Sequence, residues 1–398
     1  MRSRVAVVVA VGLCLLSACT SGRQEAPSTD TASAQASPAV SRAVITSTPA
    51  DGAQEVPAEG PVKVTAAQGR LVSVRLADRK GTEVPGRIGP DGAWTPEGRL
   101  ALATAYTLDT VAEDREGLKA AQHVAFATLA PDHTFAAFFT PEDGSTVGVG
   151  MPVSLRFSRP ITDRAAVERA VSVTADPPVP VAAHWFGGRR LDLRPEKYWA
   201  AGTKVTLSLR LKDVQGAPGD YGTQSKDVHF TVGRSVVSTV DLDAHTMTVR
   251  QDGRVLRTLK VSGGSPEFST YLGAMVISEK FPVTRMNSQT VGLGDEYDIK
   301  DVPHAMRLTS SGTFVHGNYW ASRDVFGTAN TSHGCIGLAD VKGGSDTSPA
   351  GWFFEQSTVG DVIEVRGRQG DRVPADNGLN GWNLSWDQWR AGSALGVH

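Results

Sequence analysis

Cysteine is scarce in this 398-residue chain, which contains only Cys14, Cys19 and Cys335. An excess of basic charge is also missing, because 40 Lys and Arg face 42 Asp and Glu and the net charge is −2. Without surplus cations to neutralise phosphates, the chain is not expected to bind nucleic acid. The apolar run from Val5 to Leu16 is shorter than the about 20 residues of a membrane-spanning helix. It therefore predicts an export signal.

The N-terminus has the layout of a secretory signal. Two arginines precede the apolar run, and small residues follow it. The segment Leu16-Ser17-Ala18-Cys19 resembles a bacterial lipobox, in which cleavage leaves a lipidated cysteine at the new N-terminus. We therefore expect a lipoprotein signal peptide at 1–18 and a lipid-attached flexible linker at 19–42, rich in Ser, Thr, Ala and Pro. An ordinary signal peptide that contains Cys19 by chance is the alternative.

Export leaves Cys335 as a solitary thiol. Cys14 would leave with the signal peptide, and Cys19 would carry the lipid. Cys335 then has no partner for an internal disulfide, and an unpaired thiol in an oxidising compartment is a liability unless it is used. This argument makes Cys335 the first candidate for a catalytic residue.

Two segments of the chain look like copies of each other. Thr48–Gly52 reads Thr-Pro-Ala-Asp-Gly, and 92 residues later (140 − 48) Thr140–Gly144 reads Thr-Pro-Glu-Asp-Gly. Each is followed by strand-like alternation of apolar and polar residues, and each copy closes on a similar apolar strand. This period predicts two immunoglobulin-like sandwiches, at 43–131 and 132–233. A chance recurrence of one turn motif is the competing explanation.

A third unit is expected at 234–368, and it is again mostly β. Asp252-Gly253 is a strong hairpin turn between strands predicted at 244–249 and 255–261. Further strands are predicted at 273–278, 307–308, 313–315 and 361–365, and helices at 349–356 and around 386–389. The Trp-rich tail at 369–398 is expected to pack on the body of the protein. The fold class is therefore mainly β throughout.

The residues around Cys335 suit nucleophilic catalysis. Gly334 permits a sharp turn that leaves backbone N–H groups free to face an oxyanion. His333 is two residues away, and His316 ends a predicted strand 17 residues before it (333 − 316). A histidine beside the thiol can lower its pKa, ordinarily about 8.5, and move the proton. Structural roles for each residue and a zinc site made by the three side chains remain alternatives.

Two motifs resemble the signature of the L,D-transpeptidases, which have a YkuD-type catalytic domain. They are Val315-His316-Gly317-Asn318-Tyr319-Trp320 and Thr331-Ser332-His333-Gly334-Cys335-Ile336. The resemblance extends to the actinobacterial kind, with two immunoglobulin-like domains before the catalytic one and a similar Trp-rich tail. It implies that Cys335 is the nucleophile and His316 the general base and acid, while His333 and Ser332 support the turn.

The resemblance also implies a set of substrate contacts. Met286 and Tyr297 look like parts of a flap over the donor site, and Ser311 and Gly312 would line the donor pocket. Relatives commonly carry Asn, or in many others Arg, two residues after the nucleophile. Here that position is Gly337, so the contact it makes is either missing or supplied elsewhere. Trp320 would pack against the substrate or against the core.

The implied reaction is acyl transfer between the stem peptides of peptidoglycan, giving a 3→3 cross-link without a metal or organic cofactor. The implied partners are a donor tetrapeptide, an acceptor amine and carbapenem-type inhibitors. The enzyme would act in the cell wall from the outer face of the plasma membrane, held there by its N-terminal lipid. Alternatives are an L,D-carboxypeptidase, an enzyme that attaches proteins to peptidoglycan, a zinc hydrolase and a non-catalytic wall-binding module.

Overall fold

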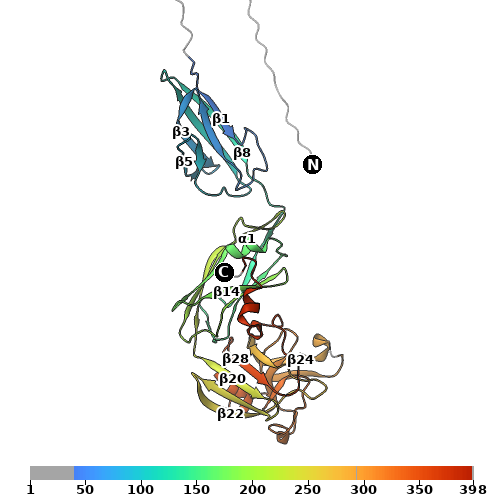
Figure 1. Cartoon of the computed structure of the whole chain (residues 1–398). Coiled ribbons are helices and arrows are strands. Elements are labelled where there is room, and N and C mark those ends of the chain that lie inside the picture. Colours follow the sequence, from blue (N-terminus) through green and yellow to red (C-terminus); the bar gives the residue numbers. More distant parts are fainter. Residues whose placement is uncertain (1–39, 293, 397–398) are drawn as a thin grey trace, which may run out of the picture.

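A computed structural model describes residues 40–292 and 294–396. The predicted signal peptide, Cys19 and most of the linker at 19–42 lie outside the described residues. The described chain is mostly β, as the sequence predicts, and is arranged as three units in a row (Figure 1). Among the described residues, no helix combines the length and apolar character that crossing a membrane requires.

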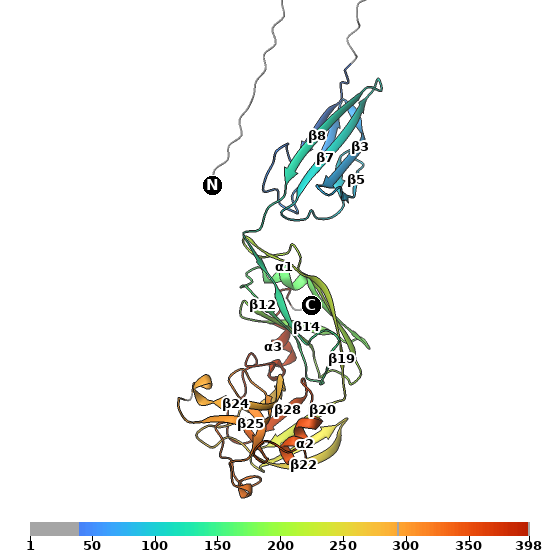
Figure 2. The same ribbon diagram turned by 180° about the vertical axis from the view of Figure 1, so that it is seen from behind.

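The first unit is a sandwich of two four-stranded sheets (Figure 2). One sheet has the order β1 (Val44–Thr48), β2 (Lys63–Ala67), β6 (Trp94–Pro96) and β5 (Gly86–Ile88). The other has the order β4 (Glu83–Val84), β3 (Gly69–Asp78), β7 (Ala105–Asp114) and β8 (Lys119–Ala127). Strand β7 alternates buried and half-buried residues along its whole length, as a strand with one face on a core must.

The second unit repeats this architecture. One main sheet has the order β10 (Ala137–Thr140), β12 (Val153–Phe157), β15 (Arg190–Pro195) and β14 (Val181–Phe186). The other has the order β11 (Thr146–Val147), β19 (Ser225–Val232), β16 (Lys204–Arg210) and β13 (Val171–Asp176). A small third sheet joins β17 (Gln215–Ala217), β18 (Asp220–Gly222) and β9 (His133–Phe135). The short helix α1 (Arg164–Arg169), capped by Asp163, was not expected from the sequence.

The recurring Thr-Pro-x-Asp-Gly motif makes the same turn in both sandwiches. Asp51 Oδ1 accepts a hydrogen bond of 2.8 Å from the N–H of Ala125, and Asp143 Oδ1 accepts one of 2.7 Å from the N–H of His229. The glycine after each aspartate has φ near +75°, which favours glycine. The motif therefore ties the start of each copy to its closing strand, and its recurrence is structural.

The third unit has a nine-stranded sheet. In spatial order the strands are β23 (Gly273–Val276), β28 (Val362–Arg366), β20 (Val236–Asp241), β21 (Thr246–Gln251), β22 (Arg254–Ser262), β27 (Ile336–Ala339), β26 (Phe314–Asn318), β25 (Asp298–Arg307) and β24 (Glu279–Asn287). The helices α2 (Pro349–Gln356) and α3 (Trp386–Arg390) match the two predicted helical regions. Three 3-10 turns are η1 (Ser288–Val291), η2 (Arg323–Val325) and η3 (Gly381–Asn383).

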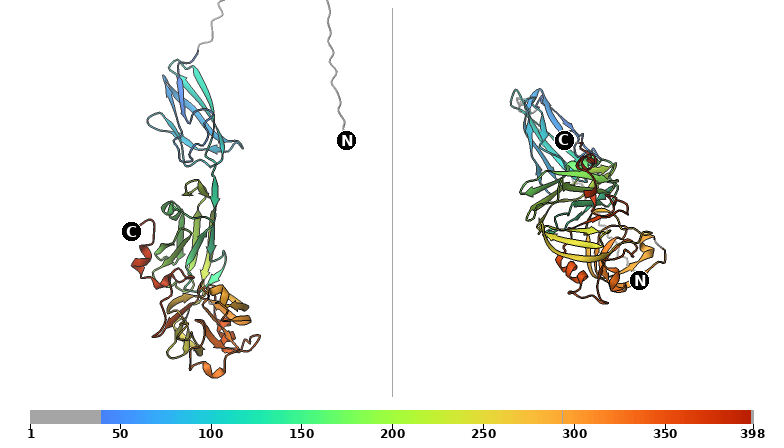
Figure 3. Two further views of the ribbon diagram at one scale, coloured as in Figure 1. Left: turned by 90° about the vertical axis from the view of Figure 1, so that its right-hand side faces the viewer. Right: turned by 60° about the horizontal axis from the view of Figure 1, so that its bottom comes forward.

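The second sandwich and the catalytic sheet share buried side chains. Val276 and Val362 of the sheet belong to the same apolar cluster as the sandwich core. The N–H of Gly148 donates to the carbonyl of Val359, and that of Gly150 to the carbonyl of Gly360, both at 2.8 Å. The C-terminal segment runs back from the catalytic unit and lies along β14 of the sandwich (Figure 3). These contacts make a continuous support for the sheet that carries the two sequence motifs.

Candidate active site

The two motifs meet on neighbouring parallel strands. Strand β26 carries His316, and β27 begins directly after Cys335, with His316 in register with Gly337. Cys335 and His316 line one cavity of about 330 Å³. The other residues that line it are Met286, Tyr297, Ile299, Asn318, Trp320, Ala321, Thr331, Ser332 and His333. Parallel pairing thus brings together two residues that lie far apart in the sequence.

The thiol of Cys335 is held in an apolar setting. Its neighbours in a small buried cluster are Met286, Val302, Ala305 and Phe314. Sγ lies 3.6 Å from the carbonyl of Gly312, to which it donates. Burial raises the pKa of the thiol to about 11, and a backbone hydrogen bond from Phe314 opposes this rise. The expectation that a histidine lowers this pKa is therefore wrong for the resting site, where desolvation dominates and the thiol is neutral.

His316 is a neutral base at rest. It is 5% exposed, and burial lowers its pKa because the imidazolium would lose its hydration, while the backbone hydrogen bond to Gly317 acts in the opposite direction. Nδ1 lies 2.9 Å from the carbonyl of Gly317, which assigns the proton to Nδ1 and leaves Nε2 as the basic nitrogen. The Trp320 ring stacks on the imidazole at 5.6 Å with 15° between the planes. That stacking favours the imidazolium when a proton arrives.

The turn before Cys335 is fixed by Ser332. Its Oγ donates to the carbonyl of Cys335 at 2.6 Å and accepts from the N–H of Gly334 at 3.2 Å. Gly334 has φ of +104°, which a residue with a Cβ rarely adopts. His333 points instead toward the flap, with its ring 5.3 Å from that of Tyr297 and Nε2 3.6 Å from Glu296. Ser332 therefore contacts the turn that it was predicted to support, whereas the contacts of His333 are with the flap.

The flap expected from the sequence is the end of the β24–β25 hairpin, including η1. Met286 is buried and Tyr297 is half-buried, and both face the cavity. Ser288 closes the hairpin, because its Oγ donates to the carbonyls of Gly294 and Tyr297. The pKa of Tyr297 is raised by burial and, to a lesser degree, by the neighbouring charge of Cys335 when ionised. Tyr297 thus lies close to the thiol, with which it lines one cavity.

The four other predicted substrate contacts, Ser311, Gly312, Gly337 and Trp320, lie in three different places. Ser311 and Gly312 line a second cavity of about 520 Å³, which shares Tyr297 and His333 with the first. Gly337 lines neither, because it is buried in β27 beside His316. Ser311 and Gly312 thus lie on the other side of Tyr297 and His333 from the cavity of His316 and Cys335. Trp320 does reach the first cavity and is 44% exposed.

Sequence reasoning missed Phe314 and Asn318, and it named Gly312 only as part of the donor pocket. The backbone of Gly312 and Phe314 approaches the sulfur, and backbone contacts of this kind leave no side-chain signature. Asn318 also lines the cavity. It lies in the first motif, two residues after His316, and this spacing puts both side chains on one face of a strand. That spacing was the available signal.

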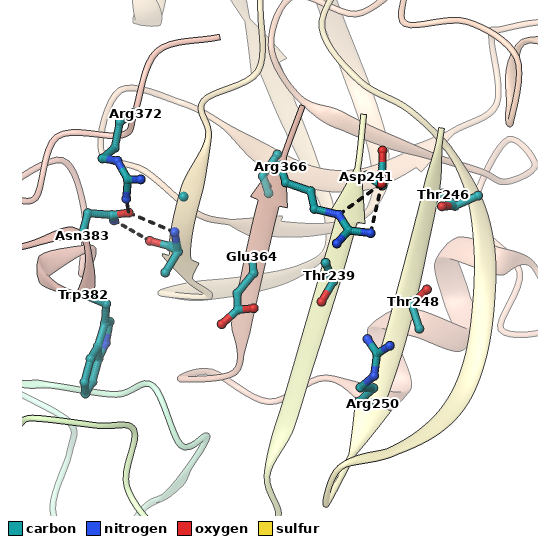
Figure 4. Close-up of a pocket in the computed structure, with 13 residues that line it drawn as sticks. Thr239, Asp241, Thr246, Thr248, Arg250, Glu364, Arg366, Arg372, Trp382 and Asn383 are labelled. Carbon is teal, nitrogen blue, oxygen red and sulfur yellow. Dashed lines mark hydrogen bonds and ion pairs between the residues drawn. The ribbon is translucent and has the colours of Figure 1, made fainter. Parts of the chain in front are cut away.

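A groove of about 500 Å³, larger than the cavity at Cys335, lies over β20, β21 and β28, next to Trp382 (Figure 4). Arg366 is paired with Asp241 there, and Asn383 hydrogen-bonds both backbone groups of Ala274 on β23. The residues that line it include no cysteine or histidine. The groove therefore lacks a candidate nucleophile, and size alone does not mark the active site. Among the described residues, no three His, Cys, Asp or Glu side chains gather as a metal site.

Comparison with known proteins identifies the family. Residues 235–365 match the L,D-transpeptidase catalytic domain, and 53–215 match a bacterial Ig domain. The chain is 36% identical to L,D-transpeptidase 2 of Mycobacterium tuberculosis over 354 residues, which cover 88% of this chain and 85% of that one. This chain belongs to the L,D-transpeptidase family. L,D-transpeptidase 5 of the same species is 32% identical to this L,D-transpeptidase, over 88% of this chain and 77% of that one.

One solved structure similar to this L,D-transpeptidase is a family member in complex with imipenem. It is 33% identical, and the match covers 58% of this chain and 98% of that chain with a TM-score of 0.49. Family membership makes this protein an enzyme of a cysteine-dependent acyltransferase class, which is the class predicted from the two motifs. Membership also confirms the predicted fold class, an immunoglobulin-like part followed by a catalytic domain.

Proposed function

We propose that this L,D-transpeptidase forms 3→3 cross-links between peptidoglycan stem peptides through a thioester on Cys335, with His316 as base and acid. The observation that carries the proposal is the pairing of a neutral buried thiol with a neutral buried imidazole in one cavity. Family membership supplies the reaction class. The stem, the linkage and the roles of the two residues are proposed.

In the first step, Sγ of Cys335 attacks the carbonyl carbon of the third, L-configured centre of a donor tetrapeptide. The S–H proton moves to Nε2 of His316. The tetrahedral intermediate collapses by breaking the C–N bond to the terminal D-alanine, whose nitrogen takes the proton from His316. The backbone N–H of Cys335 would stabilise the developing oxyanion, because the N–H of Gly334 already donates to Ser332 Oγ.

In the second step, the side-chain amine of a diamino acid in another stem attacks the thioester carbonyl. His316 takes a proton from this amine, the C–S bond breaks, and the thiol is restored. The apolar surroundings of Cys335 favour this outcome, because Met286 and Phe314 limit the access of water to the thioester. If water attacks in place of the amine, the product is a tripeptide and the enzyme is a carboxypeptidase.

Purified enzyme incubated with a tetrapeptide stem and analysed by mass spectrometry tests this proposal. The expected product is a dimer that has lost one D-alanine, and it is absent with Cys335→Ala. Tripeptide alone would assign the enzyme to hydrolysis. Transfer to a protein amine in place of a stem would assign it to protein attachment. Retention of activity by Cys335→Ala would reject the nucleophile.

We also propose that the enzyme is exported and tethered to the outer face of the plasma membrane through lipidated Cys19. The support is the signal-like start and the small residues before this cysteine. The two sandwiches then act as spacers that carry the active site into the wall. Cys19→Ala is expected to move the protein from the membrane fraction to the soluble exported fraction. Unchanged membrane association would reject the lipid anchor.

A further inference from the structure

Asn318 has a buried side chain whose amide oxygen accepts hydrogen bonds, while its NH₂ group donates none to the described residues. It ends β26, two residues after His316, and its side chain lines the same cavity as His316 and Cys335. The residue is only 8% exposed. Asparagine at the end of a buried strand is costly unless its polar atoms find partners, so the arrangement of its hydrogen bonds is informative.

The orientation of the amide is fixed by the chain that follows. Asn318 Oδ1 accepts hydrogen bonds from the N–H of Trp320 at 3.2 Å and from the N–H of Ala321 at 3.0 Å. Two backbone donors on one atom require that atom to be the oxygen, which settles the assignment of O and N. Nδ2 makes no hydrogen bond within the described residues. An unpaired NH₂ donor therefore remains at the cavity.

The neighbouring strand leaves room for this amide. Gly337 on β27 is in register with His316, two residues before Asn318, and a Cβ built on Gly337 would lie 3.5 Å from both Cβ and Nδ2 of Asn318. A larger side chain at position 337 would therefore compete for the space that the Asn318 amide occupies. The same distance is an ordinary van der Waals contact, so a Cβ alone fits at position 337. The two positions can supply a polar group to one point from two adjacent strands.

We propose that Asn318 Nδ2 donates a hydrogen bond to a backbone carbonyl oxygen of the donor stem and holds the scissile peptide over Cys335. The ligand class is an extended peptide, since an NH₂ donor needs an acceptor oxygen and the cavity already presents the nucleophile. Asn318 thereby makes the substrate contact for which Gly337 has no side chain. This inference rests on the proposed function, because it concerns the donor of the same reaction.

The first test compares Asn318→Ala with wild type in two assays. Acylation of Cys335 by a tetrapeptide donor is expected to fall about tenfold, the usual effect of one lost hydrogen bond. Alkylation of Cys335 by iodoacetamide needs no peptide contact and is expected to be unchanged. Equal slowing in both assays would mean that Asn318 only shapes the site, and no slowing in either would reject the contact. A wild type that does not react with the tetrapeptide would reject the proposed function instead.

The second test moves the amide to the neighbouring strand. Gly337→Asn in the Asn318→Ala background is expected to recover part of the lost acylation rate, because it returns an NH₂ group to the same point. Gly337→Ala in that background is the matched control, which fills space without a donor and is expected to recover nothing. Equal recovery by both would show that volume matters and would overturn the hydrogen-bond proposal. Thermal melting of each variant identifies any that fails to fold.

Discussion

Replacing His316 with Gln is expected to slow the acylation of Cys335 by a carbapenem about a hundredfold or more. The thiol has a pKa of about 11 and is neutral at rest, so the attack requires a base at the moment of bond formation. Opening of the lactam expels no leaving group, and the adduct therefore has the mass of the enzyme plus the whole drug. Intact-mass spectrometry over time gives the rate. Cys335→Ala is the matched control and is expected to show no adduct.

The same pair of residues predicts an unusual pH dependence. Iodoacetamide reacts with the thiolate, whose fraction rises about tenfold per pH unit until the pKa is reached. Because burial raises the pKa of Cys335 to about 11, the alkylation rate of the ligand-free enzyme should keep rising from pH 7 to pH 10. His316→Gln should retain this profile, since the imidazole it removes is neutral. A plateau below pH 8 in wild type would reveal a resting thiolate–imidazolium pair and contradict the neutral site.

Much of the local structure was readable from the sequence. The Asp252-Gly253 turn joins β21 and β22, and the strand and helix predicted around residues 361–365 and 349–356 are present. These features depend on neighbours in the chain, so turn chemistry and periodicity reveal them. Strands β20, β24, β25 and β27 were not predicted. Part of the reason is that a strand such as β24, with a single buried residue, lacks a clear apolar alternation.

The ionisation of the site residues was less predictable from the sequence than their identity. The motifs point to Cys335 and His316, but the ionisation of the thiol depends on Met286, Val302 and other side chains from distant strands. A nearby histidine suggests a lowered pKa, whereas burial produces a raised one. In the same way, the pairing of His316 with Gly337 follows from sheet order, which periodicity does not give. The sequence motifs thus identify the residues of the site, whereas the pKa values of these residues depend on the folded structure around them.

The packing of the C-terminal tail could not be predicted from the sequence either. The tail packs on a buried arginine, Arg194, which lies 195 residues before Trp389 (389 − 194). Arg194 lies over the rings of three tryptophans, at 4.5 Å from Trp382, 5.5 Å from Trp386 and 4.4 Å from Trp389. Burial lowers its pKa to about 10, so this charge depends on the aromatic faces and on the carbonyls of Gly381 and Leu384. The tail therefore offsets the free-energy cost of burying the Arg194 charge in the second sandwich.

Trp389→Ala is accordingly expected to destabilise the second sandwich by about 3–5 kcal/mol. Trp389 is fully buried, its N–H donates to the carbonyl of Ala182 at 2.9 Å, and its ring stacks on His184 at 4.9 Å. Calorimetric melting should show the transition lowered by several degrees. Phe138→Ala is the control, because this aromatic side chain of the same sandwich is 67% exposed and should cost less than about 0.5 kcal/mol.

Trp389→Ala also tests whether the tail only stabilises the fold or also affects catalysis. Trp389 lines neither cavity at Cys335, so below its melting transition Trp389→Ala should acylate with a carbapenem at the wild-type rate. A slowed reaction in the folded variant would show that the tail sets the geometry of the catalytic sheet. That route exists, because Asn383 and Asn380 of the tail hydrogen-bond the backbone of β23. An unchanged melting transition would instead mean that the arginine is stabilised without this tryptophan.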